Sequence, residues 1–184
     1  MNVFLDRDGV INQDRPDWVR SWEEFVFLEG AAQALARLNR AGAKLVVVSN
    51  QSLIGRGIGS AEAVDGVNRL MAEALEEAGA GLAGVFICPH APEDGCDCRK
   101  PKPGLIFQAA EVLNLDLEGG WLIGDAERDI QAGQAAGLRT ILVRTGKGAA
   151  TESQAKVRPE AVMDDLGRAA DYLIENNGTS SSES

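Results

Sequence analysis

The sequence lacks long apolar runs and holds only 3 cysteines and 1 histidine. A membrane-spanning helix needs about 20 consecutive apolar residues, and no stretch of this chain comes near that length. The N-terminus, MNVFLDRDG, has no basic segment followed by an apolar stretch, so we expect no secretory signal. These absences predict a cytoplasmic protein with no membrane partner.

Basic residues are also scarce, since 18 Lys and Arg stand against 28 Asp and Glu and give a formal net charge of -10. Such a surface repels a phosphate backbone, and no segment clusters Lys and Arg with aromatic residues, so nucleic acid is not an expected partner. The same charge would repel a small anionic substrate. Any phosphate site must therefore contain a metal ion or locally gathered cations.

Short β-branched runs alternate with longer segments of helical period, which is typical of a three-layer α/β fold with a doubly wound, mainly parallel sheet. The length fits one domain, expected over residues 1–176 as a monomer, followed by a disordered tail at 177–184 that is too polar to join a core. The predicted strands span 2–5, 44–49, 84–87, 120–124 and 139–143, and the predicted helices span 31–40, 61–79, 104–113, 128–136 and 161–175.

Polar side chains follow three of the predicted strands. Asp6 and Asp8 come after the first strand, Ser49 after the second and Asp125 after the fourth. Ligands of open α/β sheets bind where strands end, so these groups are expected to converge. Neighbouring carboxylates repel unless a cation lies between them, and Mg²⁺ binds carboxylates together with phosphate oxygens. Asp6, Asp8 and Asp125 are therefore predicted to hold Mg²⁺, although any one of them alone could equally cap a turn.

All the cysteines and the histidine lie in one segment, CPHAPEDGCDC, as Cys88, His90, Cys96 and Cys98. Three thiolates and one imidazole complete a tetrahedral zinc shell with no open position, as in structural zinc sites. A disulfide is disfavoured, because the chain is expected in the cytoplasm and one cysteine would stay unpaired. We predict a structural Zn²⁺ that braces this loop and presents the residues after it to the active site.

Four motifs occur in order: DRDGVIN at 6–12, SNQS at 49–52, RKPKPG at 99–104 and GDAERD at 124–129. In this respect the chain resembles the haloacid dehalogenase superfamily of phosphatases. The resemblance implies that Asp6 attacks phosphorus, and that Asp8 protonates the leaving oxygen and then activates water. It also implies that Ser49 and Lys100 bind the transferred phosphoryl group, with Lys102 the competing candidate, and that Asp129 orients the metal shell.

The short segments after the first two motifs leave no room for a large cap domain, so the chain resembles the capless branch of the superfamily. Loop residues must then contact the substrate, a small phosphorylated metabolite. The candidates are Asp14, Arg15, Pro16, Asp17, Asn50, Gln51, Ser52, Arg56, Arg99 and Lys100. For residues 14–17, Ser52 and Arg56, a turn-forming or solvated surface role is an equally fair interpretation.

Three functions remain open at this point. The favoured one is a sugar-bisphosphate phosphatase of the heptose type, the second is a histidinol-phosphate phosphatase, and the third is a zinc-braced interaction module without catalysis. Heptose-type members often carry Lys directly after the fourth-motif Asp, where this chain has Ala126. Lys102 and Arg56 are the candidates for the missing charge, although the short loops could equally admit other phosphorylated sugars.

Overall fold

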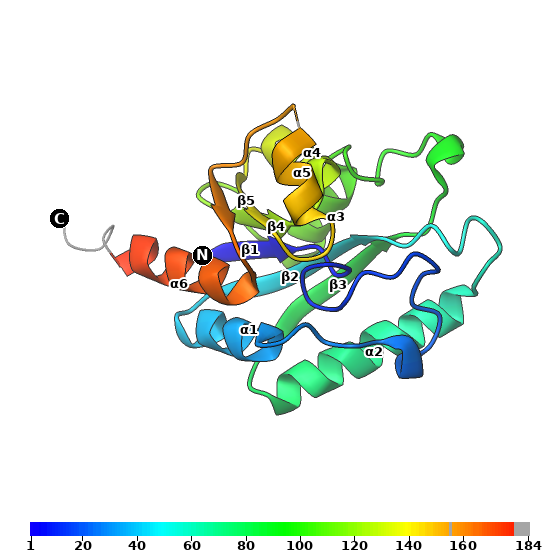
Figure 1. The fold of residues 1–184 in the computed structure, drawn as a ribbon, viewed down its shortest axis with the longest axis horizontal. Helices are drawn as coiled ribbons and strands as arrows, with labels where there is room; N and C mark the ends of the chain where they lie inside the picture. The colour runs from blue at the N-terminus through cyan, green and yellow to red at the C-terminus, as the bar shows by residue number, and fades with distance from the viewer. Residues whose placement is uncertain (155, 179–184) are drawn as a thin grey trace.

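The computed structural model describes residues 1–154 and 156–178, in which six parallel strands form one sheet in the order β3-β2-β1-β4-β5-β6 (Figure 1). The strands are β1 (Asn2–Leu5), β2 (Lys44–Asn50), β3 (Leu82–Cys88), β4 (Trp121–Gly124), β5 (Arg139–Val143) and β6 (Ala161–Met163). The helices are α1 (Ala31–Arg40), α2 (Ala61–Glu77), α3 (Gly104–Leu113), α4 (Glu127–Ala135), α5 (Gly148–Gln154) and α6 (Leu166–Gly178). The predicted doubly wound α/β fold without a large cap is confirmed.

Helices cover both faces of the sheet, with α1, α2 and α6 on one side and α3 and α4 on the other. The alternation of side chains along β1 divides the core between the two faces. Val3 and Leu5 pack with the first group of helices, whereas Phe4 packs with the second. All three are fully buried, as expected for a central parallel strand.

The last part of the chain differs from the prediction. Residues 161–163 form the edge strand β6, which pairs with β5, and the final helix begins only at Leu166. A three-residue apolar strand resembles one turn of an amphipathic helix, and Asp165 marks the true helix start by accepting a hydrogen bond from the Arg168 N–H at 2.8 Å. Helix α5 was not predicted. The predicted tail lies outside the described residues from 179 onward, and positions 177–178 end α6.

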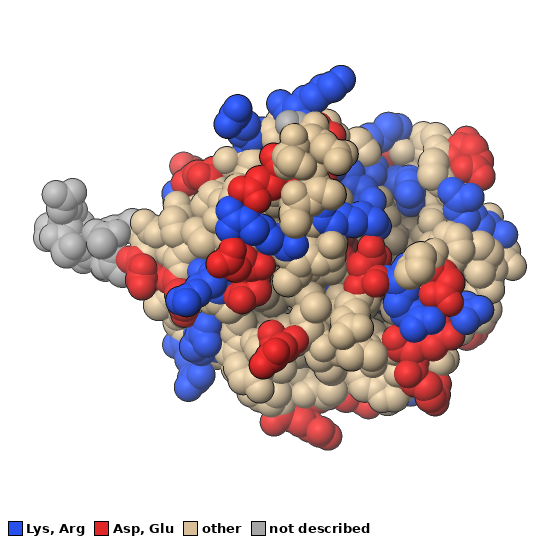
Figure 2. Space-filling view, in the orientation of Figure 1, with Lys and Arg blue, Asp and Glu red and all other residues tan. Residues whose placement is uncertain are grey.

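The carboxyl ends of the strands meet at one edge of the sheet, where the loops after β1, β2 and β3 gather (Figure 1). Lys and Arg side chains lie together at this part of the surface in Figure 2. The local charge therefore differs from the acidic average of the chain. Among the described residues, no helix is both long and apolar enough for a membrane crossing.

Candidate active site and metal centre

A cavity of about 450 Å³ opens at the strand ends. Asp6 and Asp8, which follow β1, and Ser49, near the end of β2, all line it. The other lining residues come from the end of β2, from the loops and from the start of α4, and they are Asp14, Arg15, Pro16, Trp18, Asn50, Ser52, Arg99, Arg128 and Lys147. The cavity thus joins two of the predicted catalytic carboxylates to most of the predicted substrate loops.

A carboxylate cluster, formed by Asp6, Asp125 and Asp129, lies at the base of this site. One oxygen of each side chain lies within 4.8 Å of the others, and all three residues are buried. Asp129 Oδ2 also accepts a hydrogen bond from the Ala126 N–H at 3.0 Å, which fixes the start of α4. Three buried carboxylates this close have the donor set and the charge that Mg²⁺ binds.

Asp125 is the member of the cluster that most needs a cation. Its Oδ2 accepts a hydrogen bond from the Lys147 N–H at 2.8 Å, while its buried Oδ1 has no hydrogen-bond partner among the described residues. Burial, and then the charges of Asp6 and Asp129, raise the pKa of Asp125 to about 7. A Cβ at Gly9 or Gly146 would come within 2.2 Å of Asp125 Oδ2, so glycines at these positions make room for the carboxylate. The residues therefore fit a divalent cation.

Lys100 joins two members of the cluster. Its fully buried ammonium lies 3.0 Å from Asp6 Oδ1 and 2.7 Å from Asp129 Oδ1, and it donates a hydrogen bond to the Val48 carbonyl. Burial alone would raise the pKa of Asp6, but the charges of Lys100 and Arg128 outweigh it, so the pKa of Asp6 is lowered. Asp6 is therefore an anion at neutral pH, as a nucleophile must be.

The competing lysine, Lys102, lies elsewhere. Its exposed ammonium is 2.9 Å from Asp97 Oδ1 and donates to the Gly95 carbonyl within the cysteine-rich loop. The structure thus brings Lys100, and not Lys102, to the carboxylate cluster.

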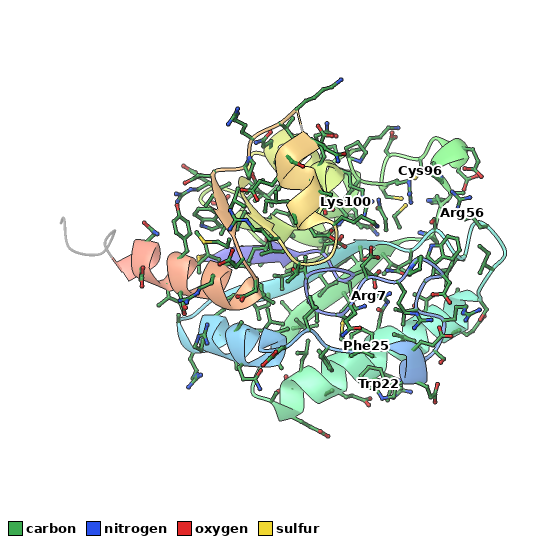
Figure 3. All side chains as sticks on the ribbon, viewed as in Figure 1. Arg7, Trp22, Phe25, Arg56, Cys96 and Lys100 are labelled. Carbon is green, nitrogen blue, oxygen red and sulfur yellow. The ribbon has the colours of Figure 1, made fainter. Side chains whose placement is uncertain are left out.

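Asp8 lines the cavity, but its carboxylate is not part of the carboxylate cluster. Arg7 Nη2 lies 3.0 and 3.1 Å from its two oxygens, Asn12 Nδ2 donates to Oδ1 and Gln51 Nε2 donates to Oδ2, each at 2.8 Å. The fully buried Arg7, which is labelled in Figure 3, donates a hydrogen bond from Nη1 to Asn68 Oδ1 of α2 at 2.9 Å. This arrangement differs from the expected pairing of Asp8 with Asp6 and Asp125 around Mg²⁺, because buried donors occupy both Asp8 oxygens.

The motif after β2 connects three parts of the site. Ser49 Oγ accepts a hydrogen bond from Gln51 Nε2 at 2.9 Å, and its own hydrogen has no acceptor within the described part of the chain, so it can be donated to a ligand. The Asn50 amide exchanges two hydrogen bonds with the Lys100 backbone, at 3.0 and 3.1 Å. The loop that carries Lys100 is therefore pinned directly to the end of β2. Gln51 is buried beneath the cavity and does not line it.

Only some of the residues predicted to contact the substrate line the cavity. Asp14, Arg15 and Pro16 line the cavity, whereas Asp17 does not and instead pairs with Arg15 at 3.0 Å. Ser52 and Arg99 also line the cavity. The exposed Arg56 does not (Figure 3).

Three lining residues were absent from the sequence prediction: Trp18, Arg128 and Lys147. Arg128 lies in the first turn of α4, with Nη2 4.0 Å from Asp6 Oδ2, and the Lys147 ammonium is 2.9 Å from Asp14 Oδ2. Position 128 lies inside the fourth motif, three residues past Asp125, and this spacing was the available signal. Lys102 and Arg56, the candidates for the charge missing at Ala126, do not line the cavity, whereas Arg128 and Lys147 do.

The cysteine–histidine cluster forms as the spacing predicts. The sulfurs of Cys88, Cys96 and Cys98 are 3.3 to 3.6 Å apart, and His90 Nδ1 is 3.3 Å from Cys98 Sγ and 3.7 Å from Cys88 Sγ. These separations exceed a disulfide bond, about 2.05 Å. They are close to those of ligands around one tetrahedral zinc with Zn–S of about 2.3 Å. Burial raises the pKa of Cys88 to about 12, so this thiol needs a cation in order to ionise. The four side chains fit a structural zinc ion.

Comparisons with known proteins agree with this geometry. Residues 97–169 match the HAD-hydrolase-like family model. The chain is 38% identical over 173 residues to D-glycero-beta-D-manno-heptose-1,7-bisphosphate 7-phosphatase of Pseudomonas aeruginosa, with 94% of this chain and 97% of that protein covered. The enzyme of the same name from Neisseria meningitidis serogroup B is 41% identical over 178 residues, with 95% of each chain covered.

A solved structure resembles the whole fold. The crystal structure of D,D-heptose 1,7-bisphosphate phosphatase from B. bronchiseptica, complexed with magnesium and phosphate, superposes with a TM-score of 0.91 at 39% identity. The match covers 95% of this chain and 98% of that chain. The chain belongs to the haloacid dehalogenase-like hydrolases.

Proposed function

We propose that this chain is a Mg²⁺-dependent phosphatase that removes the 7-phosphate of D-glycero-β-D-manno-heptose 1,7-bisphosphate. The observation that carries the proposal is a group of three buried residues, of which Asp6 lines the cavity. Asp6 is anionic and pairs with Lys100, and beside it Asp125 has a buried oxygen without a hydrogen-bond partner among the described residues. Relatives named for this activity favour the heptose substrate over histidinol phosphate. The same relatives are enzymes, which disfavours an interaction module without catalysis.

Mg²⁺ would be held by Asp6 and Asp125, with Asp129 beside them, and would offset the charge of the phosphoryl group. In the first step an Asp6 oxygen bonds to phosphorus, the ester P–O bond breaks, and Asp8 gives its proton to the leaving oxygen. In the second step a water oxygen bonds to phosphorus, the Asp6–phosphorus bond breaks, and Asp8 takes the proton from water. Ser49 donates its free hydrogen to a phosphoryl oxygen, and Lys100 adds a positive charge beside Asp6.

The cysteine–histidine cluster would hold Zn²⁺ as a brace rather than as a catalyst, because four ligands leave no open position. Its purpose follows from the chain order, since Arg99 and Lys100 come directly after Cys98. Free thiols and zinc suit the reducing cytoplasm, where we propose that the protein works.

The proposal is tested by phosphate release from heptose 1,7-bisphosphate and from histidinol phosphate, each with and without added Mg²⁺. Phosphorus NMR of the sugar product identifies the position that is cleaved. We expect Mg²⁺-dependent loss of the 7-phosphate, with a higher kcat/KM than for histidinol phosphate. Asp6→Asn, which is nearly isosteric but is not an anionic nucleophile, should remove turnover while the protein stays folded and keeps its zinc. Near-normal activity in this variant would sink the mechanism.

A further inference from the structure

Arg128 is a cation of the cavity that the proposed steps do not use. Its side chain starts in the first turn of α4, is 35% exposed and lines the cavity. Nη2 lies 4.0 Å from Asp6 Oδ2, and Nε lies 4.0 Å from Asp129 Oδ1. Both separations are too long for hydrogen bonds.

The guanidinium is therefore close to two carboxylates without being bonded to either. Its Nε is buried and has no hydrogen-bond partner among the described residues. A buried donor without an acceptor costs free energy, and a guanidinium presents several donors in one plane, a geometry that matches phosphate oxygens. An anion that enters the cavity beside Asp6 would give the guanidinium an acceptor.

The charge balance points to the same conclusion. Asp6, Asp125 and Asp129 face two cations, Lys100 and Arg128, so the group carries one net negative charge when all are ionised. A divalent metal ion makes this group net positive by one charge. The group with its metal ion then attracts a dianionic phosphoryl group, whereas the three carboxylates with Lys100 as their single cation would repel it.

We propose that Arg128 is a further catalytic residue, whose guanidinium binds the oxygens of the phosphoryl group that is transferred to Asp6. This inference rests on the proposed phosphatase function. It assigns Arg128 to the reacting phosphate, while Arg99, on the loop after the cysteine–histidine cluster, remains the candidate for the distal one. Because the contact is with the reacting group, Arg128 serves every phosphate ester that the site accepts.

The direct test measures binding rather than turnover. Inorganic phosphate is titrated calorimetrically into the zinc-containing protein at saturating Mg²⁺, for the wild type, Arg128→Met, Arg128→Lys and the control Arg56→Met. The control removes an exposed arginine that does not line the cavity. We expect Arg128→Met to weaken phosphate binding by about ten- to a hundredfold, the range for one charged hydrogen bond, Arg128→Lys to fall between, and Arg56→Met to bind as the wild type does. If the methionine variant does not fold, Arg128→Gln gives the same test with a polar side chain.

Two further measurements separate this role from its competitors. Aryl phosphate and heptose bisphosphate should lose kcat/KM by the same factor in Arg128→Met, whereas a loss confined to the bisphosphate would move Arg128 to the distal group and overturn the proposal. Unchanged phosphate affinity together with tighter Mg²⁺ binding would make Arg128 a mere counter-ion and would also overturn it. Wild-type protein that binds phosphate but hydrolyses no ester would refute the phosphatase function instead, and the calorimetry would still decide the Arg128 contact.

Discussion

Replacing Asp125 with asparagine tests whether the carboxylate cluster is built for a metal ion. Without a cation, ionised Asp125 lies buried beside Asp6 and Asp129, with one oxygen lacking a partner. The amide introduced by this substitution has nearly the same shape as the carboxylate, and its oxygen can still accept the hydrogen bond from the Lys147 N–H. We therefore expect Asp125→Asn to stabilise the Mg²⁺-free protein at alkaline pH and to abolish its stabilisation by Mg²⁺.

The expected size follows from the pKa of Asp125, which rises from the ordinary value of 3.8 to about 7. The folded state then holds this proton more tightly than the unfolded state, so stability falls as pH rises through this window and is constant above it. A shift of this size corresponds to at most about 4 kcal/mol at about 1.4 kcal/mol per pH unit. Below about pH 4 the carboxyl is protonated in both states, so the substitution should have little effect there.

The assay is urea denaturation at pH 5 and pH 8 in buffer without added Mg²⁺, followed by the same series with Mg²⁺. Chelators are avoided because they would also remove zinc. The gain in free energy of unfolding from Asp125→Asn should be larger at pH 8 than at pH 5. Mg²⁺ should stabilise the wild type through its binding energy and leave the variant unchanged. An equal gain at both pH values would refute the electrostatic reasoning, and equal stabilisation of both proteins by Mg²⁺ would show that Asp125 is not a ligand.

Three other substitutions test separate parts of the site. Asp8→Asn should slow both leaving-group protonation and hydrolysis of the intermediate, so that acid quench traps a phosphoenzyme; normal rates in both steps would exclude Asp8 as the acid-base. Cys96→Ser should lower the zinc content from about one ion per chain and reduce activity, because the loop then no longer holds Lys100 in place. The control Lys102→Ala, in the same loop, should keep both zinc and activity. Full zinc content in the serine variant would contradict the ligand set. Arg99→Ala should narrow the preference in kcat/KM for the bisphosphate over small monophosphates by about 1.5–3 kcal/mol. An equal loss of kcat/KM on both classes would show that Arg99 does not bind the distal phosphate.

Much of this site could be predicted because chain direction and local spacing determine it. The sheet is parallel, so groups at the carboxyl ends of β1, β2 and β4 lie at the same edge whatever the conformation of the loops. Asp6, Ser49 and Asp125 were found in this way. The cysteine–histidine cluster is also local, since its four residues lie within 11 positions of one another.

The parts that sequence reasoning missed depend on packing between distant segments. The carboxylate of Asp8 is held by Arg7, whose own position depends on Asn68, 61 residues further on. No periodicity in DRDGVIN reports that contact. Lys147 reaches the cavity only because the turn after β5 folds back onto Gly9, where Thr145 Oγ1 donates to the Gly9 carbonyl at 2.6 Å. Edge strand β6 was missed because three apolar residues carry too little pattern to distinguish a strand from a helical turn.

The arrangement of charge explains how an acidic chain can use an anionic substrate. Arg7 offsets Asp8 on one side of the cavity, and Lys100 lies between Asp6 and Asp129 on the other. At this cavity, and among the described residues, Asp125 Oδ1 and Arg128 Nε remain buried without a hydrogen-bond partner. A phosphate that arrived before the metal ion would meet a group with net negative charge, and one that arrived after it would meet a positive group. We therefore expect a bound metal ion to strengthen phosphate binding at this site. The overall charge of -10 does not exclude an anionic substrate, because the local charge at the strand ends acts on it at short range.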